Sequence, residues 1–275
     1  MFFSRLHEIC ILLVPQGRRG RVVLGHLALS VLMAAAVSVV VFVFWFPTHL
    51  RHLAGGLQLF WTMVGVDVVC GPLLMLVLYR PTKTRRALAV DFSLIAVVQL
   101  SALAYGLNAL AHARPLVMVF EVDRFRLVSY ADIAERDVKH LPPWAQPWGL
   151  APPRVLGVKT ATSPAERLEN FDLALQGVEI GQRPKLWQDY AANRQQVLER
   201  SKPLSALSAA RPDQQRFITR AVADALNDVQ PGETNKPEEL RWLPLVSRRS
   251  LDWVVFLDPS SLRIRAYAPI DGFIQ

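Results

Sequence analysis

Three long apolar segments dominate the first 112 residues of the chain. They cover residues 22–46, 57–79 and 87–111, and the acidic side chains within them are Asp67 and Asp91. At a rise of about 1.5 Å per residue, a helix of any of these lengths crosses the apolar core of a bilayer, which is about 30 Å thick. The pattern therefore predicts a three-helix transmembrane bundle in residues 22–112.

Residues 1–21 contain a short apolar stretch of their own, "FFSRLHEICILLV" at residues 2–14. One interpretation is an amphipathic helix that lies on the inner leaflet of the membrane. The other is an ordinary extension upstream of the natural start of the protein. The first long segment is not typical of a cleaved signal peptide, because it is too long and its end, "FVFWFP", lacks a small-residue cleavage pattern.

Basic residues beside the apolar segments predict the orientation. Arg18, Arg19 and Arg21 precede the first segment, and Arg80, Lys83, Arg85 and Arg86 separate the second from the third, whereas the loop between the first two carries only Arg51. By the positive-inside rule, residues 1–21 and the 80–86 loop are cytoplasmic, and three crossings place residues 113–275 on the other side. In a Gram-negative bacterium that side of the inner membrane is the periplasm. The expected interface anchors are Trp45, Trp61, Tyr79 and Tyr105.

Residues 113–275 combine strand-like and helix-like patterns. Strand candidates lie in residues 114–133, 153–161, 239–248, 252–261 and 262–270, and helical periods in residues 163–177, 183–201 and 211–228. The first strand candidate places Val117, Val119, Glu121 and Asp123 on one face, and Met118, Phe120 and Val122 on the other. These elements predict a soluble α+β domain with an antiparallel sheet.

Local signals support three of these boundaries. Ser163 and Glu166 form a capping box with Pro164 at the first helical position, and Gly177 ends that helix. Asp258–Pro259 predicts a hairpin turn between the last two strands. The proline-rich residues 141–153 predict a loop, or a flap over the sheet.

Two polar side chains are expected near the middle of the membrane. Asp67 in the second segment and Gln99 in the third reach similar depth, because the two helices run antiparallel. An isolated carboxylate is costly in a low dielectric, so we expect Asp67 to face Gln99 rather than lipid. A structural hydrogen bond and a contact with a partner are both open interpretations. A proton relay is disfavoured, because the first segment supplies only His26.

Small residues and a proline lie on the same segment as Asp67. Gly65 and Gly71 allow another helix to approach closely, and Pro72 removes a backbone donor and predicts a kink. Together they favour a surface for helix–helix contact. Asp91 lies near the cytoplasmic end of the third segment, where a pair with Arg85 or Arg86 is its simplest explanation.

Charge and motifs exclude several classes of function. Residues 1–112 hold nine Lys/Arg against three acids, and residues 113–275 hold 22 against 20, so most of the net charge of +8 flanks the membrane and no nucleic-acid surface is expected. The two cysteines lie in the membrane half, and the chain has no zinc, nucleophile or phosphate-loop motif. We therefore expect no catalytic residue, metal or cofactor. Glu121, Asp123 and Arg124 are surface candidates, best explained as ion pairs at a strand edge.

An ordered set of segments resembles a known family. The segments are "VFVFWFP", "GVDVVCGPLLMLVLYRP", "AVDFSLIAVVQLSALAYGL" and "RPLVMVFEVDRFRLVSYADI". They resemble the type IV pilin accessory proteins, the TfpX/TfpZ/FimB-like group, best over residues 22–135 and more loosely to the end. The N-terminal 21 residues depart from the short start usual in that family.

The resemblance implies a non-enzymatic inner-membrane protein that supports pilus assembly as a chaperone or modulator. Its implied partners are a major type IV pilin, through the pilin's membrane helix and periplasmic head, and the lipid bilayer. As a hypothesis, Asp67 or Asp91 contacts polar groups of the pilin helix. The alternatives are a general membrane scaffold, a sensor with a periplasmic ligand-binding domain, and a membrane enzyme. The short cytoplasmic segments argue against the sensor.

Overall fold

The described residues form two compact units. The computed structural model describes residues 18–78, 80 and 82–274. The helical unit contains the described residues up to Val43 together with Leu57–Leu110, and the sheet unit contains Phe44–Gly56 and Ala111–Gln275 as far as they are described. The proposed interfacial helix at residues 2–14 and the anchor at position 79 lie outside the described residues.

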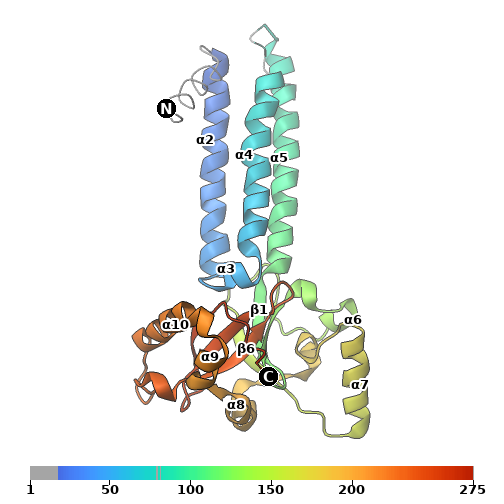
Figure 1. Ribbon diagram of the computed structural model, residues 1–275. Helices are drawn as coiled ribbons and strands as arrows, with labels where there is room; N and C mark the ends of the chain where they lie inside the picture. Colours follow the sequence, from blue (N-terminus) through green and yellow to red (C-terminus); the bar gives the residue numbers. More distant parts are fainter. Residues whose placement is uncertain (1–17, 79, 81, 275) are drawn as a thin grey trace. The chain divides into compact units, whose positions relative to one another are not determined.

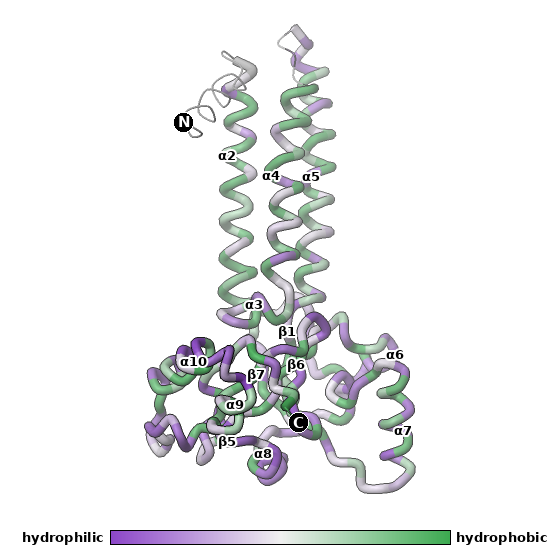
Figure 2. The backbone as a smooth tube through the Cα atoms, in the orientation of Figure 1, coloured by the Kyte–Doolittle hydropathy of each residue, from purple (hydrophilic) through white to green (hydrophobic). Residues whose placement is uncertain are grey.

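Three long helices make up the helical unit (Figure 1). They are α2 (Arg18–Val39), which continues as the π-helical η1 (Val40–Trp45), α4 (Gly56–Leu78) and α5 (Arg85–Ala113). The segments long and apolar enough to cross a membrane are Gly20–Trp45, Gly56–Leu78 and Arg85–Ala113, which confirms three apolar helices. Figure 2 shows them coloured as hydrophobic over most of their length.

The sheet unit contains one mixed sheet of eight strands. The strands are β1 (Pro115–Phe120), β2 (Phe125–Ser129), β3 (Arg154–Val158), β4 (Trp187–Asp189), β5 (Lys202–Pro203), β6 (Arg241–Val246), β7 (Trp253–Leu257) and β8 (Ile264–Ala268). Their order is β4-β3-β1-β2-β6-β7-β8, with β5 paired to β6. Because β1 pairs in parallel with β3, and β2 with β6, the prediction of an antiparallel sheet is wrong. Periodicity reports which face a residue occupies and carries no information on the direction of the neighbouring strand.

Strand β1 is buried on both faces. Met118 and Phe120 belong to one apolar cluster, and Val117 and Val119 belong to another. The predicted alternation of these residues is confirmed, but neither face meets solvent. Glu121 and Asp123 follow the end of β1, in the turn that leads to β2, and are not strand residues.

Short helices complete the sheet unit. They are α3 (Leu50–Leu53), α6 (Glu135–Val138), α7 (Pro164–Leu175), α8 (Arg194–Arg200), α9 (Leu204–Ala210) and α10 (Gln215–Asn227), with 3-10 turns η2 (Tyr130–Asp132), η3 (Ile180–Gln182), η4 (Pro184–Leu186), η5 (Tyr190–Asn193), η6 (Pro212–Gln214) and η7 (Pro237–Glu239). Helices α7 and α10 lie at opposite ends of the unit (Figure 1).

Of the helices predicted from local sequence signals, the one beginning at Ser163 is confirmed and the one over residues 183–201 is wrong in part. The capping box is confirmed, since the Glu166 backbone N–H donates to Ser163 Oγ over 3.2 Å, and Gly177 adopts the predicted left-handed conformation with φ of 80°. The predicted helix over residues 183–201 is wrong over its first half. There Trp187 pairs with Val158 as part of β4, because the sheet pairing outweighs a weak helical period.

Residues 44–56 fold into the sheet unit, although the sequence predicts the end of the first apolar segment and a loop there. Leu50 and Leu53 are buried in the cluster that contains Met118 and Phe120. Ser247 Oγ donates to the backbone oxygen of Leu53 over 2.8 Å. This segment and residues 111–274 therefore belong to one folded body.

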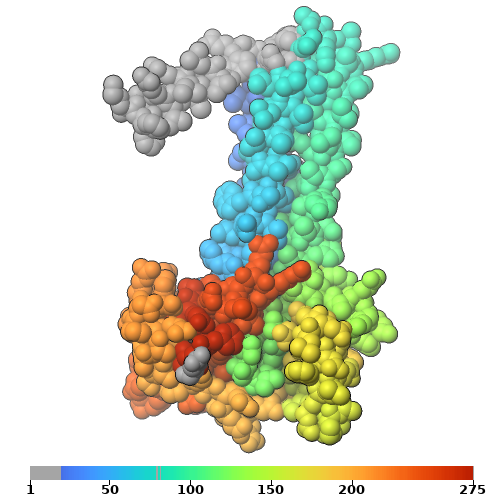
Figure 3. Space-filling model, turned by 45° about the vertical axis from the view of Figure 1, so that its right-hand side comes forward, coloured from blue at the N-terminus to red at the C-terminus, as the bar shows by residue number. Residues whose placement is uncertain are grey.

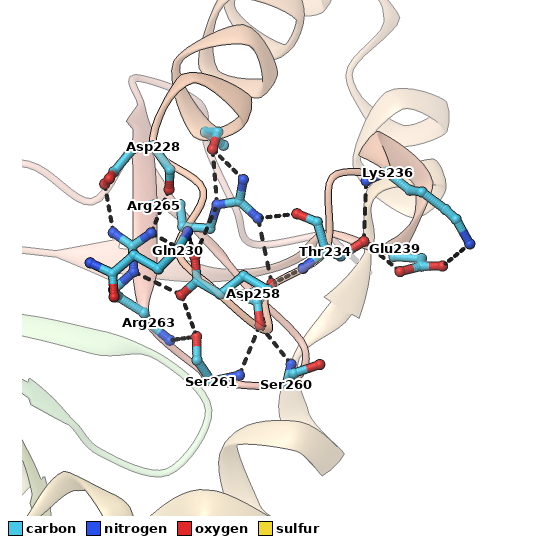
Figure 4. Close-up of polar contacts among 12 residues, drawn as sticks. Asp228, Gln230, Thr234, Lys236, Glu239, Asp258, Ser260, Ser261, Arg263 and Arg265 are labelled. Carbon is cyan, nitrogen blue, oxygen red and sulfur yellow. Dashed lines mark hydrogen bonds and ion pairs between the residues drawn. The ribbon is translucent and has the colours of Figure 1, made fainter.

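A network of ion pairs holds the β7–β8 hairpin (Figure 4). Asp258 Oδ1 accepts from the backbone N–H groups of Ser260 and Ser261, each over 2.8 Å, which confirms the predicted turn. Arg265, which is fully buried, donates to Asp258 Oδ2 over 3.4 Å. Arg263 donates to Glu233 Oε2 over 2.7 Å, so the loop after α10 is tied to the same hairpin.

This network is expected to make stability depend on pH in the acid range. The hydrogen bonds from Arg263 lower the pKa of Glu233 to about 2, from 4.5 in an ordinary chain. The stabilisation is therefore fully present above the unfolded pKa and is lost as the pH falls from about 4.5 to about 2. We expect the difference in unfolding free energy between the wild type and Glu233→Gln to shrink over that window in denaturant titrations. A difference that stays constant there would contradict the assignment.

Candidate functional site

The three helices of the helical unit meet at Gly71 on α4. A Cβ atom placed on Gly71 would lie 2.2 Å from Nε2 of Gln99 on α5 and 2.6 Å from Nε2 of His26 on α2. Both distances are far below van der Waals contact, so the space beside Gly71 is already filled by these two polar side chains. A residue without a side chain is required for this meeting of helices.

Asp67 lies one turn before Gly71 and contacts Gln99, but not in the predicted way. The Gln99 amide donates to the backbone oxygen of Asp67 over 3.2 Å, not to its carboxyl group. The missing side chain of Gly71 leaves that oxygen open to a second donor. Pro72 lies within α4 and has no N–H group, so the backbone oxygen of Val68 lacks its helical donor. Gln99 does not bind that oxygen but the oxygen of the preceding residue, Asp67.

Two polar groups beside Gly71, on His26 and Asp67, are withdrawn from full contact with the surroundings in the described part of the chain. Nε2 of His26 is buried without a hydrogen-bonding partner, and the carboxyl of Asp67 is half-buried. Such groups are costly in a bilayer unless a neighbour satisfies them. We call His26, Asp67, Gly71 and Gln99 the polar cluster. Sequence reasoning missed His26 as a member, although its position near one end of α2 matches the depth of Gly71.

The other predicted membrane residues lie outside this cluster. Gly65 faces open space, with no atom within 4 Å of the position that a Cβ would take, so its predicted close contact is not made within the described chain. Asp91 pairs with Lys83 over 2.5 Å between Nζ and Oδ2, and not with Arg85 or Arg86. At 3.6 residues per turn those two arginines point to other faces of α5, whereas Lys83 precedes the helix and is free to reach Asp91.

The outer-domain candidates form ion pairs, in agreement with the preferred interpretation. Glu121 accepts from Arg126 Nε over 2.8 Å and from the Gly181 backbone N–H over 3.0 Å. Burial raises the pKa of Glu121, and Arg126 opposes that shift. Asp123 pairs with Arg124 over 2.7 Å. Glu121 is ion-paired as expected, but it lies in the turn after β1, where its side chain is buried and bound by η3, and not at a strand edge.

A groove of about 590 Å³ lies between this turn and α7, lined among others by Glu121, Val122, Val158 and Phe171. No residue of α7 is fully buried, and its Leu168, Phe171 and Leu175 are exposed at helical spacing. Figure 3 shows this helix, in yellow, on the surface of the sheet unit. Sequence reasoning assigned no role to this apolar stripe, although its three- and four-residue spacing was visible.

Groups suited to metal or cysteine chemistry do not gather in the described residues. No three His, Cys, Asp or Glu side chains there come together as a metal site. Cys70 is a free, exposed thiol on α4. The arrangement thus offers polar groups and apolar surfaces for recognition.

Comparison with known proteins gives a family. No protein-family model and no solved structure matches the chain. It is 34% identical over 249 residues to the fimbrial assembly protein of serogroup E1 from Dichelobacter nodosus, covering 90% of this chain and 93% of that relative. The serogroup I protein of the same organism is 35% identical over 251 residues, with the same coverage, and the protein of serogroups C1 and C2 is 41% identical over 108 residues, which are 39% of this chain and 82% of that relative. The chain therefore belongs to the family of fimbrial assembly proteins.

Proposed function

We propose that this protein is a non-enzymatic accessory protein of the inner membrane that holds a major type IV pilin before the pilin enters the pilus. The observation that carries the proposal is the polar cluster, in which Nε2 of His26 is buried without a hydrogen-bonding partner among the described residues and the Asp67 carboxyl is half-buried. In a bilayer these groups favour a partner helix that supplies a polar side chain or a terminal amine.

The division of the chain into units supports the proposed orientation. Residues 44–56 and the residues after 110 belong to the same folded unit, which favours one side of the membrane for both. An odd number of crossings, here α2, α4 and α5, then places the N-terminus on the other side. Combined with the positive-inside rule, this favours a periplasmic sheet unit. Its groove beside α7 is the proposed contact for the pilin head.

Photocrosslinking in living cells tests the membrane part of the proposal. A photoreactive residue at position 65 or 67 is expected to form adducts with the pilin, because Gly65 lies on the open side of α4 and Asp67 in the polar cluster. Gly65 and Asp67 lie on nearly opposite faces of α4, so adducts at one of the two positions identify the face that the pilin contacts. Val77, which lies on the same helix and is strongly exposed, is the control for nonspecific proximity. Adducts at position 171 on α7 would report contact with the pilin head.

Other outcomes separate the alternatives. Pilin adducts confined to position 171 would contradict a binding site in the membrane and leave the sheet unit as the contact. Equal adducts at positions 65, 67 and 77 would indicate nonspecific proximity in the bilayer. Unchanged surface pili, twitching and pilin level after deletion of the gene would contradict the accessory role altogether.

A further inference from the structure

The chain passes between the sheet unit and the membrane-crossing helices at three points, next to residues 44, 56 and 111. These points lie at the membrane surface, because each is covalently continuous with a segment that crosses the apolar core. Two of them are in contact: a Cβ on Gly56 would lie 2.4 Å from the ring of Phe46. Any loop of the sheet unit bound to these residues is therefore held at the level of the lipid headgroups.

One such loop is the end of the proline-rich segment, residues 146–151. Arg114, the first residue after α5, is buried and donates to the backbone oxygens of Gly149 and, over 3.2 Å, of Gln146. Trp45, at the end of η1, donates from Nε1 to the same Gly149 oxygen over 3.1 Å. Trp45 and Arg114, which lie next to two of these three points, therefore both bind the Gly149 oxygen of this loop.

The loop presents apolar side chains to its surroundings. Trp45, an expected interface anchor, is only 2% exposed, so it does not serve as one. Its ring packs edge-on against Trp148, at 5.6 Å between centroids, and Trp148 is 54% exposed. Leu150, two residues later, is equally exposed. The exposed tryptophan next to the end of η1 is therefore Trp148, and not Trp45.

A second loop, the β6–β7 hairpin at residues 247–252, lies beside the passage into α4. Ser247 Oγ donates to the Leu53 oxygen over 2.8 Å, and the Arg249 side chain fills the space beside Gly55, where a Cβ would lie 2.4 Å from Arg249 Cδ. The hairpin carries Leu251, which is exposed, and the largely exposed side chain of Arg248.

We propose that these two loops form a lipid-binding surface, the collar, that sits in the headgroup layer of the membrane. Tryptophan favours this layer because its ring is apolar and its N–H group is polar. Leu150 and Leu251 add apolar surface, and the exposed side chain of Arg248 attracts the phosphates of anionic phospholipids. The collar fixes the height of the sheet unit above the bilayer, independently of whether a pilin is bound.

Fluorescence quenching in vesicles tests the collar. The full-length protein, with Cys10 and Cys70 replaced by serine, receives a single cysteine as Trp148→Cys or Leu251→Cys and an environment-sensitive NBD label. It is reconstituted into vesicles of phosphatidylethanolamine and phosphatidylglycerol that contain lipids with a nitroxide near the headgroup. We expect a blue shift and loss of most of the emission at both positions. Circular dichroism verifies the fold of each variant.

Phe171→Cys on α7 is the matched control, because Phe171 is an equally exposed aromatic residue of the same unit and lies outside the collar. Its label should stay unquenched; quenching at position 148 no stronger than at 171 overturns the proposal. Replacing phosphatidylglycerol by phosphatidylcholine is expected to weaken quenching at 251 while leaving it at 148. Identical quenching at 251 in both lipids would overturn the role of Arg248.

Discussion

Gly71→Leu is expected to disrupt the packing of the helical unit and to abolish pilus assembly. The new Cβ alone would lie 2.2 Å from Gln99 Nε2 and 2.6 Å from His26 Nε2, and the rest of the leucine occupies the same space. Gln99 must then give up its bond to the Asp67 oxygen, and α2 or α5 must move away from α4. Overpacking of this kind costs about 1–3 kcal/mol. Gly71→Ala should show a smaller loss, since only the tips of two flexible side chains need to move.

Gly65→Leu is the matched control, because it adds the same side chain to the same helix at a site with no atom within 4 Å. Thermal unfolding in detergent should detect a loss of stability in Gly71→Leu and none in Gly65→Leu. If Gly65 faces a pilin helix, Gly65→Leu should nevertheless reduce surface pili and crosslinked pilin. Wild-type stability and piliation in Gly71→Leu would contradict the importance of the polar cluster.

The features that sequence reasoning predicted well are those encoded over a few neighbouring residues. Uninterrupted apolar runs are enough to predict α2, α4 and α5, because a lipid environment requires both length and apolar composition. The capping box at Ser163 and the Asp258 turn depend on side chains that bind backbone groups two or three residues away. Such signals need no knowledge of the rest of the fold.

The features that it missed depend on distant parts of the chain. The parallel pairing of β2 with β6 joins strands separated by more than a hundred residues, and no local pattern records it. Leu50 and Leu53 look like ordinary loop residues until β1 and β7 cover them. In the candidate site, the depth of Asp67 and Gln99 was predictable, but the bond to a backbone oxygen and the approach of His26 follow from helix packing around Gly71.

Asp258→Ala is expected to cause the largest loss of stability in the sheet unit. Its carboxylate is fully buried and accepts from the backbone N–H groups of Ser260 and Ser261 and, over 2.8 Å, of Thr234. It also pairs with Arg265, whose guanidinium is fully buried as well. Removing one partner of a buried ion pair costs about 3–5 kcal/mol, because the remaining charge stays buried without compensation.

Glu239→Ala provides the control within the same network (Figure 4). Glu239 pairs with Lys236 over 2.8 Å, but both side chains are exposed, so its removal should cost much less than the removal of Asp258. Denaturant unfolding of the full-length protein, followed by near-ultraviolet circular dichroism, measures both changes. Equal losses of unfolding free energy in the two variants would contradict this prediction. They would mean that the charge of Arg265 is compensated without Asp258, by the Thr234 oxygen over 2.6 Å and by Glu233 at 3.9 Å. A much larger loss for Asp258→Ala instead identifies this carboxylate as the group that joins α10, the loop after it and the β7–β8 hairpin into one cooperative body.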